Sequence, residues 1–196
     1  MMTMMTMMTR RPFLRWLGLV AVLTTVPARA ADPVLLAQLR RGGNLILMRH
    51  AATVPGIGDP DGFVLARCGT QRNLSAEGRR DAVRIGEAFS SLAIPVADVL
   101  SSRWCRCLDT ARLAFGRATP APLLDSMFAD DAGSRADKLR ATRAWLATLR
   151  GDGNIVLVTH DINIQALAGR YLRQGEMLVA TVGEGGTLRV AGVWSA

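Results

Sequence analysis

The sequence predicts an α/β domain, a three-layer α/β/α sandwich around a mostly parallel central sheet. Short apolar runs alternate along the chain with longer stretches in which apolar residues recur every three to four positions, as strands alternating with helices require. The runs at 44–48 and 155–159 are almost wholly apolar, which is typical of parallel strands buried on both faces. Arg49 and His50 follow the first run, and His160, the second of only two histidines, follows the other.

Turn-forming residues mark the first elements of this domain. Residues 32–33 (Asp-Pro) predict the start of a short helix, which the glycines at 42–43 end before the first strand. Ser75 is a suitable N-cap for a helix that extends to about Leu92. The loop at 51–73 is long and rich in Gly, Pro, Asp and Arg. Loops of this length in compact domains usually have a function.

The alternation of strands and helices continues to the end of the chain. Pro95 separates the helix that begins at Ser75 from the next strand, and Gly116 ends the helix after that strand. The sequence shows neither an internal repeat nor a second domain, so these segments complete one fold. Strands are expected at 96–100, 121–124, 177–182 and 187–194, and helices at about 103–115, 135–149 and 161–171.

The first 30 residues are predicted to be an export signal. After a Met/Thr repeat, Arg10 and Arg11 open a charged region, an apolar stretch covers 16–26, and Ala28–Ala30 forms an A-x-A cleavage site. The paired arginines resemble a twin-arginine signal, with a general secretory signal as the alternative. The apolar stretch is too short to span a bilayer. We therefore expect a periplasmic protein without a stable membrane anchor, with one domain at 31–196.

The charge of the chain argues against nucleic acid as a partner. The formal net charge is +8, but four of the 24 basic residues and none of the acids lie in the first 30 positions. The domain that follows has a net charge of +4, without a block of Lys and Arg or interleaved aromatic residues. A mildly positive protein is compatible with a small anionic substrate.

Three cysteines, Cys68, Cys105 and Cys107, would meet an oxidising compartment after export. One disulfide is expected between Cys68 and either of the others, because positions 105 and 107 are too close in sequence to pair easily. The remaining thiol stays free. A metal site on Cys-x-Cys lacks enough further ligands, so neither a metal nor another cofactor is expected.

Several predicted strands end on side chains that suit phosphoryl chemistry. Guanidinium groups make paired hydrogen bonds to phosphate oxygens, and a histidine can attack phosphorus to form a phosphohistidine that water cleaves. A second histidine would stabilise the transferring group, while a carboxylic acid would protonate the leaving alcohol and activate water. Because the carboxyl ends of parallel strands share one edge of a sheet, these residues are expected in one pocket. The candidates are Arg49, His50, Arg106, Asp125, His160 and Asp161.

Four segments, in order, resemble the histidine phosphatase superfamily, which has a phosphoglycerate-mutase-like fold. Residues 47–51 (Leu-Met-Arg-His-Ala) resemble its RHG motif, and residues 73–82 resemble the helix start after the loop. Residues 101–111 are similar to its SS-x3-R-x3-TA segment, and 158–160 (Val-Thr-His) match the segment of the second histidine. The resemblance covers about 44–170, which is more specific than any one motif.

This resemblance implies a role for each matching residue. His50 would be the nucleophile. Arg49, Arg106 and His160 would bind the phosphoryl group, and the hydroxyl of Thr53 would add a contact. These five roles follow from where the residues lie in the segments that resemble the family.

Two departures from the family pattern concern the same site. Ala51 replaces the glycine after the first histidine, a small change where the backbone is not left-handed. The acid has two candidates: Asp125 falls near the acid of the mutase-like branch, whereas His160-Asp161 resembles the His-Asp pair of acid phosphatases and phytases. We favour Asp161 slightly.

The predicted function is therefore that of an exported phosphomonoesterase, which hydrolyses a small phosphorylated substrate through a phosphohistidine on His50 and needs no metal. The layout resembles small exported members that act on envelope phosphosugars, so an envelope phosphosugar is the candidate substrate. The alternative is a non-catalytic phosphate-ligand binding protein that retains the pocket, suggested by Ala51 and the unassigned acid.

Other conspicuous side chains are expected to be structural. Three loop arginines are interpreted as solvated, one serine as an N-cap only, and three tryptophans as packing residues. These are Arg67, Arg72 and Arg103, then Ser75, then Trp104, Trp145 and Trp194.

Overall fold

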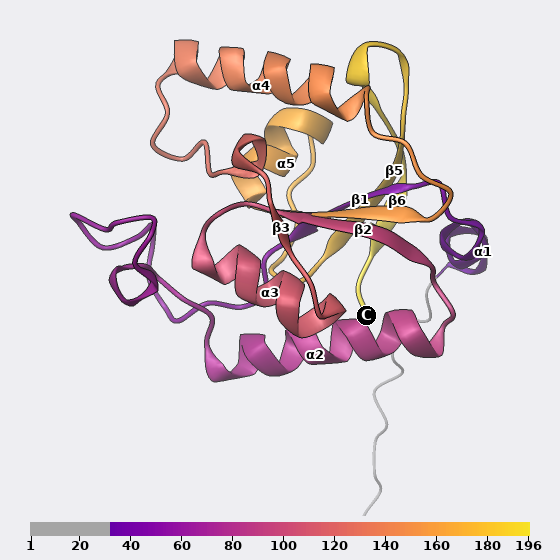
Figure 1. Ribbon diagram of the computed structural model, residues 1–196, viewed down its shortest axis with the longest axis horizontal. Helices are drawn as coiled ribbons and strands as arrows, with labels where there is room; N and C mark the ends of the chain where they lie inside the picture. Colours follow the sequence, from indigo (N-terminus) through magenta and orange to yellow (C-terminus); the bar gives the residue numbers. More distant parts are fainter. Residues whose placement is uncertain (1–31) are drawn as a thin grey trace, which may run out of the picture. The chain divides into compact units, whose positions relative to one another are not determined.

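A six-stranded sheet forms the centre of residues 32–196, the part of the chain that the computed structural model describes (Figure 1). Its strands are β1 (Leu45–Arg49), β2 (Val96–Ser101), β3 (Thr119–Pro120), β4 (Asn154–Thr159), β5 (Met177–Val182) and β6 (Leu188–Trp194). In space the order is β3-β2-β4-β1-β5-β6. The first four strands in this order pair in parallel, whereas β5 pairs antiparallel with both β1 and β6. The predicted signal at 1–30 lies outside the described residues and stays a prediction.

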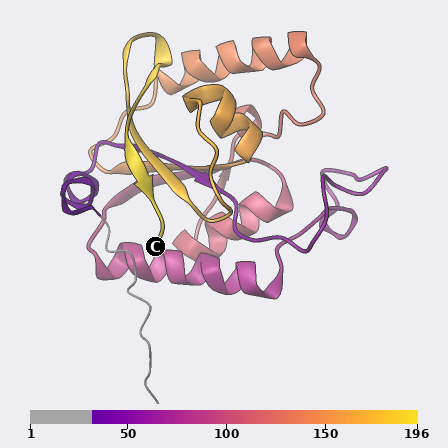
Figure 2. The ribbon, with the colours of Figure 1, turned by 180° about the vertical axis from the view of Figure 1, so that it is seen from behind.

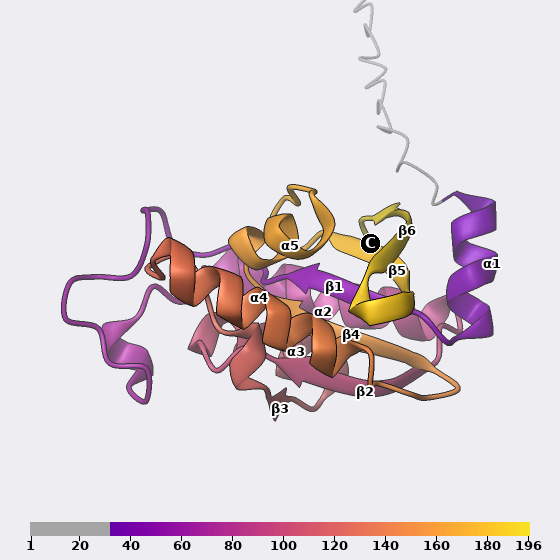
Figure 3. The same cartoon turned by 90° about the horizontal axis from the view of Figure 1, so that it is seen from above.

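Helices cover both faces of this sheet, as Figures 1 and 3 show. The inward residues of β1 alternate between the two faces: Ile46 and Met48 pack in one cluster, and Leu45 and Leu47 pack in the other. The prediction of a three-layer sandwich with a mostly parallel sheet is thus confirmed. The first cluster includes residues of α1 (Pro33–Arg41), α2 (Ala76–Ser91) and α3 (Cys105–Phe115), and the second those of α4 (Ala132–Leu146) and α5 (Asp161–Ala168).

The start of α2 is fixed beside the predicted site. Ser75 caps the helix as predicted, because its hydroxyl accepts a hydrogen bond from the Gly78 N–H at 3.0 Å. A Cβ on Gly78 would lie 1.9 Å from the backbone oxygen of Ala52. Only glycine therefore lets the first turn of α2 contact the chain immediately after His50.

Several boundaries differ from the sequence-based expectation. Residues 121–124 are not a strand: Pro122–Leu124 is a single 3-10 turn, and the short strand lies just before it. Helix α4 begins at Ala132, earlier than predicted, because Asp131 accepts a hydrogen bond from the Ser134 N–H and caps a first turn that looked like a loop in the sequence. Helix α5 ends at Ala168, where Gly169 adopts a left-handed conformation.

Helix α3 also begins two residues later than predicted, at Cys105. Trp104 before it has an extended backbone, and the Arg103 N–H donates to Asp125 rather than entering the helix. Among the described helices, none is long and apolar enough to cross a membrane.

Candidate active site

Parallel pairing of β1 and β4 brings the two histidines together. Arg49 is in register with Thr159, and the His50 N–H donates to the Thr159 carbonyl at 3.1 Å. The centroids of the His50 and His160 rings lie 5.6 Å apart, and the rings meet edge to face. Although both are nearly buried, 4% and 3% exposed, their neighbours include polar groups of Ser102 and Ala51.

Both imidazoles are held in the neutral form. The pKa of His50 is lowered from 6.5 to about 3, mainly because burial penalises the cation, and further because Arg106, Arg49 and Arg72 are positively charged. Burial and the neighbouring His50 also lower the pKa of His160 well below its usual value. A neutral imidazole retains the lone pair that a nucleophile needs.

The tautomer of His50 follows from its hydrogen bond. Its Nδ1 lies 2.9 Å from the carbonyl oxygen of Ala51. Since a carbonyl can only accept, Nδ1 carries the proton and Nε2 keeps the free lone pair. Ala51 itself has no positive φ, so the alanine at this position causes no left-handed strain.

Three arginines surround these rings with unused donors. Arg49 Nη1 donates to the Leu172 carbonyl at 2.6 Å, and Arg72 Nη1 donates to the Thr53 hydroxyl at 2.9 Å. Four guanidinium Nε groups within residues 32–196 are buried without a hydrogen-bond partner, those of Arg49, Arg72, Arg106 and Arg135, and the first three lie near the histidines. Buried polar groups are normally satisfied. Three orphaned guanidinium donors therefore point to an anion as the ligand of this site.

The interpretation of Arg72 as a solvated loop residue was wrong. Its side chain bonds Thr53 and Gly56, and burial, together with the charge of Arg106, lowers its pKa. The hydroxyl of Thr53, predicted to contact the phosphoryl group, accepts from Arg72 and from Gln174 Nε2 at 3.1 Å. Arg67 is exposed, as expected.

Sequence analysis missed Asp59. Its carboxylate accepts two hydrogen bonds from Arg106, with Nη1–Oδ1 at 2.7 Å and Nη2–Oδ2 at 3.2 Å. It also accepts one from the Trp104 indole N–H at 2.8 Å, so Trp104 does more than pack. The only signal in the sequence was the length of the loop at 51–73, which extends beyond the sheet in Figures 1 and 2.

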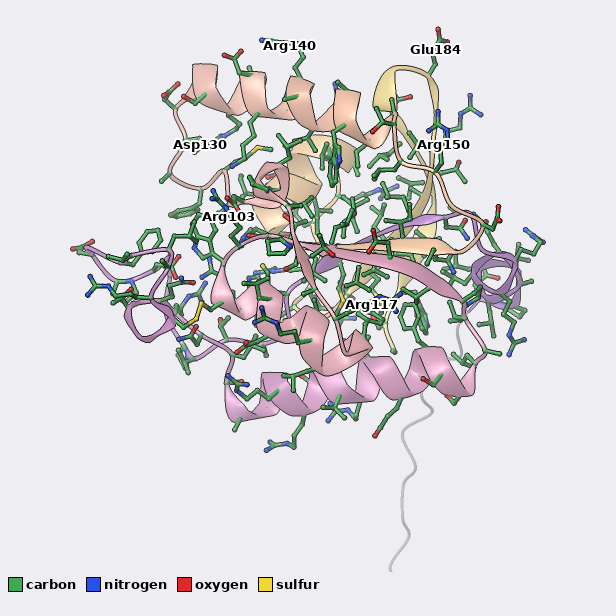
Figure 4. All side chains as sticks on the ribbon, in the orientation of Figure 1. Arg103, Arg117, Asp130, Arg140, Arg150 and Glu184 are labelled. Atoms are coloured by element: carbon green, nitrogen blue, oxygen red, sulfur yellow. A yellow bond between two sulfur atoms is a disulfide. The ribbon has the colours of Figure 1, made fainter. Side chains whose placement is uncertain are left out.

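The two candidate acids lie in different environments. Asp125 is 4% exposed, and both its oxygens accept from Arg103: Oδ1 from the backbone N–H at 2.8 Å and Oδ2 from Nε at 2.7 Å. Arg103, labelled in Figure 4, is exposed as expected, and it is also ion-paired with Asp125. The Ser102 hydroxyl lies 3.4 Å from Asp125 Oδ1 and 2.9 Å from His160 Nε2, and so bridges the two residues.

Asp161 is the more accessible carboxylate. It is the first residue of α5, and its side chain is 26% exposed. Oδ1 accepts from the Leu172 N–H at 3.0 Å and lies 3.9 Å from Arg49 Nη1. The carboxylate is thus beside one of the predicted phosphate-binding arginines without being enclosed by it.

A disulfide attaches the long loop to this site. Cys68 pairs with Cys105 (Figure 4), one of the two predicted alternatives, with their Cα atoms 5.6 Å apart. Cys105 is the first residue of α3 and precedes Arg106. Cys107 is free and buried, and burial raises the pKa of its thiol to about 12. No three His, Cys, Asp or Glu side chains in the described part of the chain are grouped as metal ligands would be.

Comparisons with known proteins agree with this architecture. A family model for the histidine phosphatase superfamily (branch 1) matches residues 45–130. No curated protein matches the chain by sequence.

Solved structures with the same fold include a phosphoglycerate mutase from Thermus thermophilus, at 19% identity and a TM-score of 0.57, covering 78% of this chain and 99% of that one. A mycobacterial glucosyl-3-phosphoglycerate phosphatase has the same identity and TM-score, with 78% and 98% covered. The protein histidine phosphatase SixA, complexed with tungstate, is 15% identical, with a TM-score of 0.54 and 78% and 96% covered. The fold is therefore phosphoglycerate-mutase-like.

Proposed function

Because the family match and the shared fold support the histidine phosphatase superfamily, we propose that the chain is a phosphomonoesterase acting through a phosphohistidine on His50. One observation carries this proposal. Two neutral histidines face each other at 5.6 Å, and three guanidinium groups nearby each have a buried Nε–H without a partner in residues 32–196. Such an arrangement suits a tetrahedral anion that is attacked by nitrogen.

In the first step, His50 Nε2 attacks the phosphorus of the monoester. A nitrogen–phosphorus bond forms, the bond from phosphorus to the ester oxygen breaks, and the leaving alkoxide takes a proton from a carboxylic acid. Arg49, Arg106 and His160 stabilise the charge on the other phosphoryl oxygens. In the second step the same carboxylate removes a proton from water, which attacks phosphorus and releases orthophosphate and neutral His50.

We assign the proton transfers to Asp161 and a positioning role to Asp125. Both oxygens of Asp125 already accept hydrogen bonds from Arg103, so this carboxylate acts as an acceptor. Through Ser102 it orients His160. Asp161 is partly exposed beside Arg49, where a substrate held by that arginine would place its leaving group.

The dependence on the leaving group tests this assignment. A good leaving group such as p-nitrophenolate needs little protonation, whereas an alkoxide needs it fully. Asp161→Asn should therefore reduce kcat/KM, which reports the first step, far more for an alkyl phosphate than for p-nitrophenyl phosphate. Asp125→Asn, the matched variant, should reduce both by the same factor. The opposite pattern would make Asp125 the acid.

Hydrolysis itself is tested on the purified protein with p-nitrophenyl phosphate. We expect activity that His50→Ala abolishes and that a chelator leaves unchanged, together with a phosphoenzyme stable to alkali but labile to acid. The alternative is a phosphate-ligand binding protein that retains the arginines and histidines of the site but does not hydrolyse its ligand. An inert wild type that still binds orthophosphate would establish that alternative.

The place of action and the natural substrate belong to the same proposal. The features of residues 1–30 support export to a periplasm, where an envelope phosphosugar would be the substrate. Cell fractionation tests the location. A screen of phosphorylated sugars, with orthophosphate release as the measurement, tests the substrate class.

A further inference from the structure

The carboxylate of Asp59 accepts hydrogen bonds from both Nη groups at the end of the Arg106 guanidinium. Both side chains are almost buried, with exposed fractions of 8% for Asp59 and 5% for Arg106. Besides its two bonds from Arg106, Asp59 accepts from the Arg72 backbone N–H at 3.0 Å and from the Trp104 indole at 2.8 Å. Four N–H donors from three residues thus converge on its two oxygens.

A guanidinium group offers two paired sets of donors to an anion. One pair is at its end, on Nη1 and Nη2, and the other is along its side, on Nε and Nη2. Asp59 takes the end pair of Arg106. The Nε–H remains buried and has no partner in the described chain. The side edge is therefore the one that Arg106 has left for a ligand.

We propose that Asp59 is a positioning residue, which grips the end of Arg106 so that its Nε edge faces the phosphoryl group of the substrate. This inference rests on the proposed function and adds a residue to it. Asp59 does not touch the substrate. It acts through Arg106, by fixing the orientation of the guanidinium plane before the substrate arrives, so that binding orders fewer groups.

The surroundings of Asp59 favour a fixed anchor over a carboxylate that leaves when phosphate binds. Displacement of Asp59 would break four hydrogen bonds at once. It would also require movement of a loop that the Cys68–Cys105 disulfide ties to α3. Asp59 also compensates the charges of Arg106 and Arg72, which lie close enough for each to disfavour the other. An alternative in which Asp59 competes with phosphate for Arg106 predicts the opposite sign of effect.

Binding of inorganic orthophosphate separates these two roles without requiring catalysis. In Asp59→Asn the amide cannot accept from both Nη groups of Arg106. We therefore expect the Kd for orthophosphate, measured calorimetrically, to rise about tenfold, as for loss of a charged hydrogen-bond partner. For p-nitrophenyl phosphate, KM should rise by a similar factor and kcat should change less. Asp61→Asn is the matched control, since Asp61 is exposed in the same loop, and should leave Kd unchanged.

A double-mutant cycle shows whether Asp59 acts through Arg106. Lysine has a point charge and no paired edge to orient. In an Arg106→Lys background, Asp59→Asn should therefore weaken orthophosphate binding no further. An equal penalty in both backgrounds would mean that Asp59 only stabilises the loop, and would overturn the proposal. If Asp59→Asn does not fold, Trp104→Phe can replace it in the cycle with Arg106→Lys, because it removes one hydrogen-bond donor to Asp59 and keeps an aromatic ring.

The remaining outcomes are also decisive. Unchanged or tighter orthophosphate binding by Asp59→Asn would overturn the positioning role, and tighter binding would identify Asp59 as a competitor of phosphate. In both cases hydrolysis by the wild type would leave the proposed function standing. A wild type that neither binds orthophosphate nor hydrolyses p-nitrophenyl phosphate would overturn both.

Discussion

Lowering the pH from 7 to 5 should destabilise this protein through His50. The pKa of His50 is about 3 in the folded protein against 6.5 for an ordinary histidine, because the ring is buried next to guanidinium charges. Between these values the unfolded chain binds a proton that the native chain does not, so the free energy of unfolding falls as the pH falls. The contribution is fully present above pH 6.5 and is lost progressively down to about pH 3. At about 1.4 kcal/mol per pH unit, His50 alone should remove about 2 kcal/mol between pH 7 and pH 5.

The measurement is urea unfolding at both pH values, for the wild type and for His50→Asn. Asparagine does not titrate, so the difference between the two proteins isolates His50 together with its effect on His160, whose pKa His50 helps to lower. The wild type should lose about 2 kcal/mol more than the variant over this interval. Equal losses in the two proteins would show that His50 titrates normally and is accessible to water. The assignment of His50 as a neutral, buried nucleophile would then be wrong.

Three further predictions concern the supports of the site. Reduction of the Cys68–Cys105 disulfide, which spans 37 positions, should lower the free energy of unfolding by up to about 4 kcal/mol on the chain-entropy model, seen as a lower urea midpoint in dithiothreitol; an unchanged midpoint would contradict it. Gly86→Ala places a Cβ 2.0 Å from a backbone oxygen of α3 and should cost about 1–3 kcal/mol, measured as a lower Tm than that of the wild type. Ser102→Ala removes the bridge to His160 and should lower kcat for p-nitrophenyl phosphate about tenfold; full activity would exclude this bridge from catalysis.

The sequence predicted the elements whose signal is local. Buried parallel strands are continuous apolar runs, and two such runs ending on His50 and His160 were enough to place both rings at one edge of the sheet. The resemblance of residues 101–111 to a family segment then predicted Arg106 beside them. Ser75 was predictable for the same reason, since an N-cap depends only on its own first turn.

The parts that sequence analysis missed depend on contacts between distant segments. Asp59 meets Arg106 across 47 positions, and no periodicity records such a pair. Arg72 looked solvated because it lies in a loop, but the folded loop brings its side chain to Thr53 and close enough to His50 to lower the pKa of that ring. The prediction of a strand at 121–124 was wrong because apolar residues near Pro122 can be buried in a 3-10 turn as well as in a strand.

The strongly lowered pKa of His50 matters most when a substrate is bound. A phosphate monoester brings negative charge beside the ring, and an opposite charge within about 4–6 Å raises the pKa of a histidine by about 1–3 units. Starting from about 3, the imidazole would still be neutral at pH 7 in the complex, with its Nε2 lone pair available for attack. A histidine with the ordinary value of 6.5 would instead become protonated beside the same anion, and the nucleophile would be lost. In the proposed mechanism burial and the arginines therefore act together: Arg49 and Arg106 would bind the anion, and with Arg72 and burial they would keep the attacking nitrogen unprotonated.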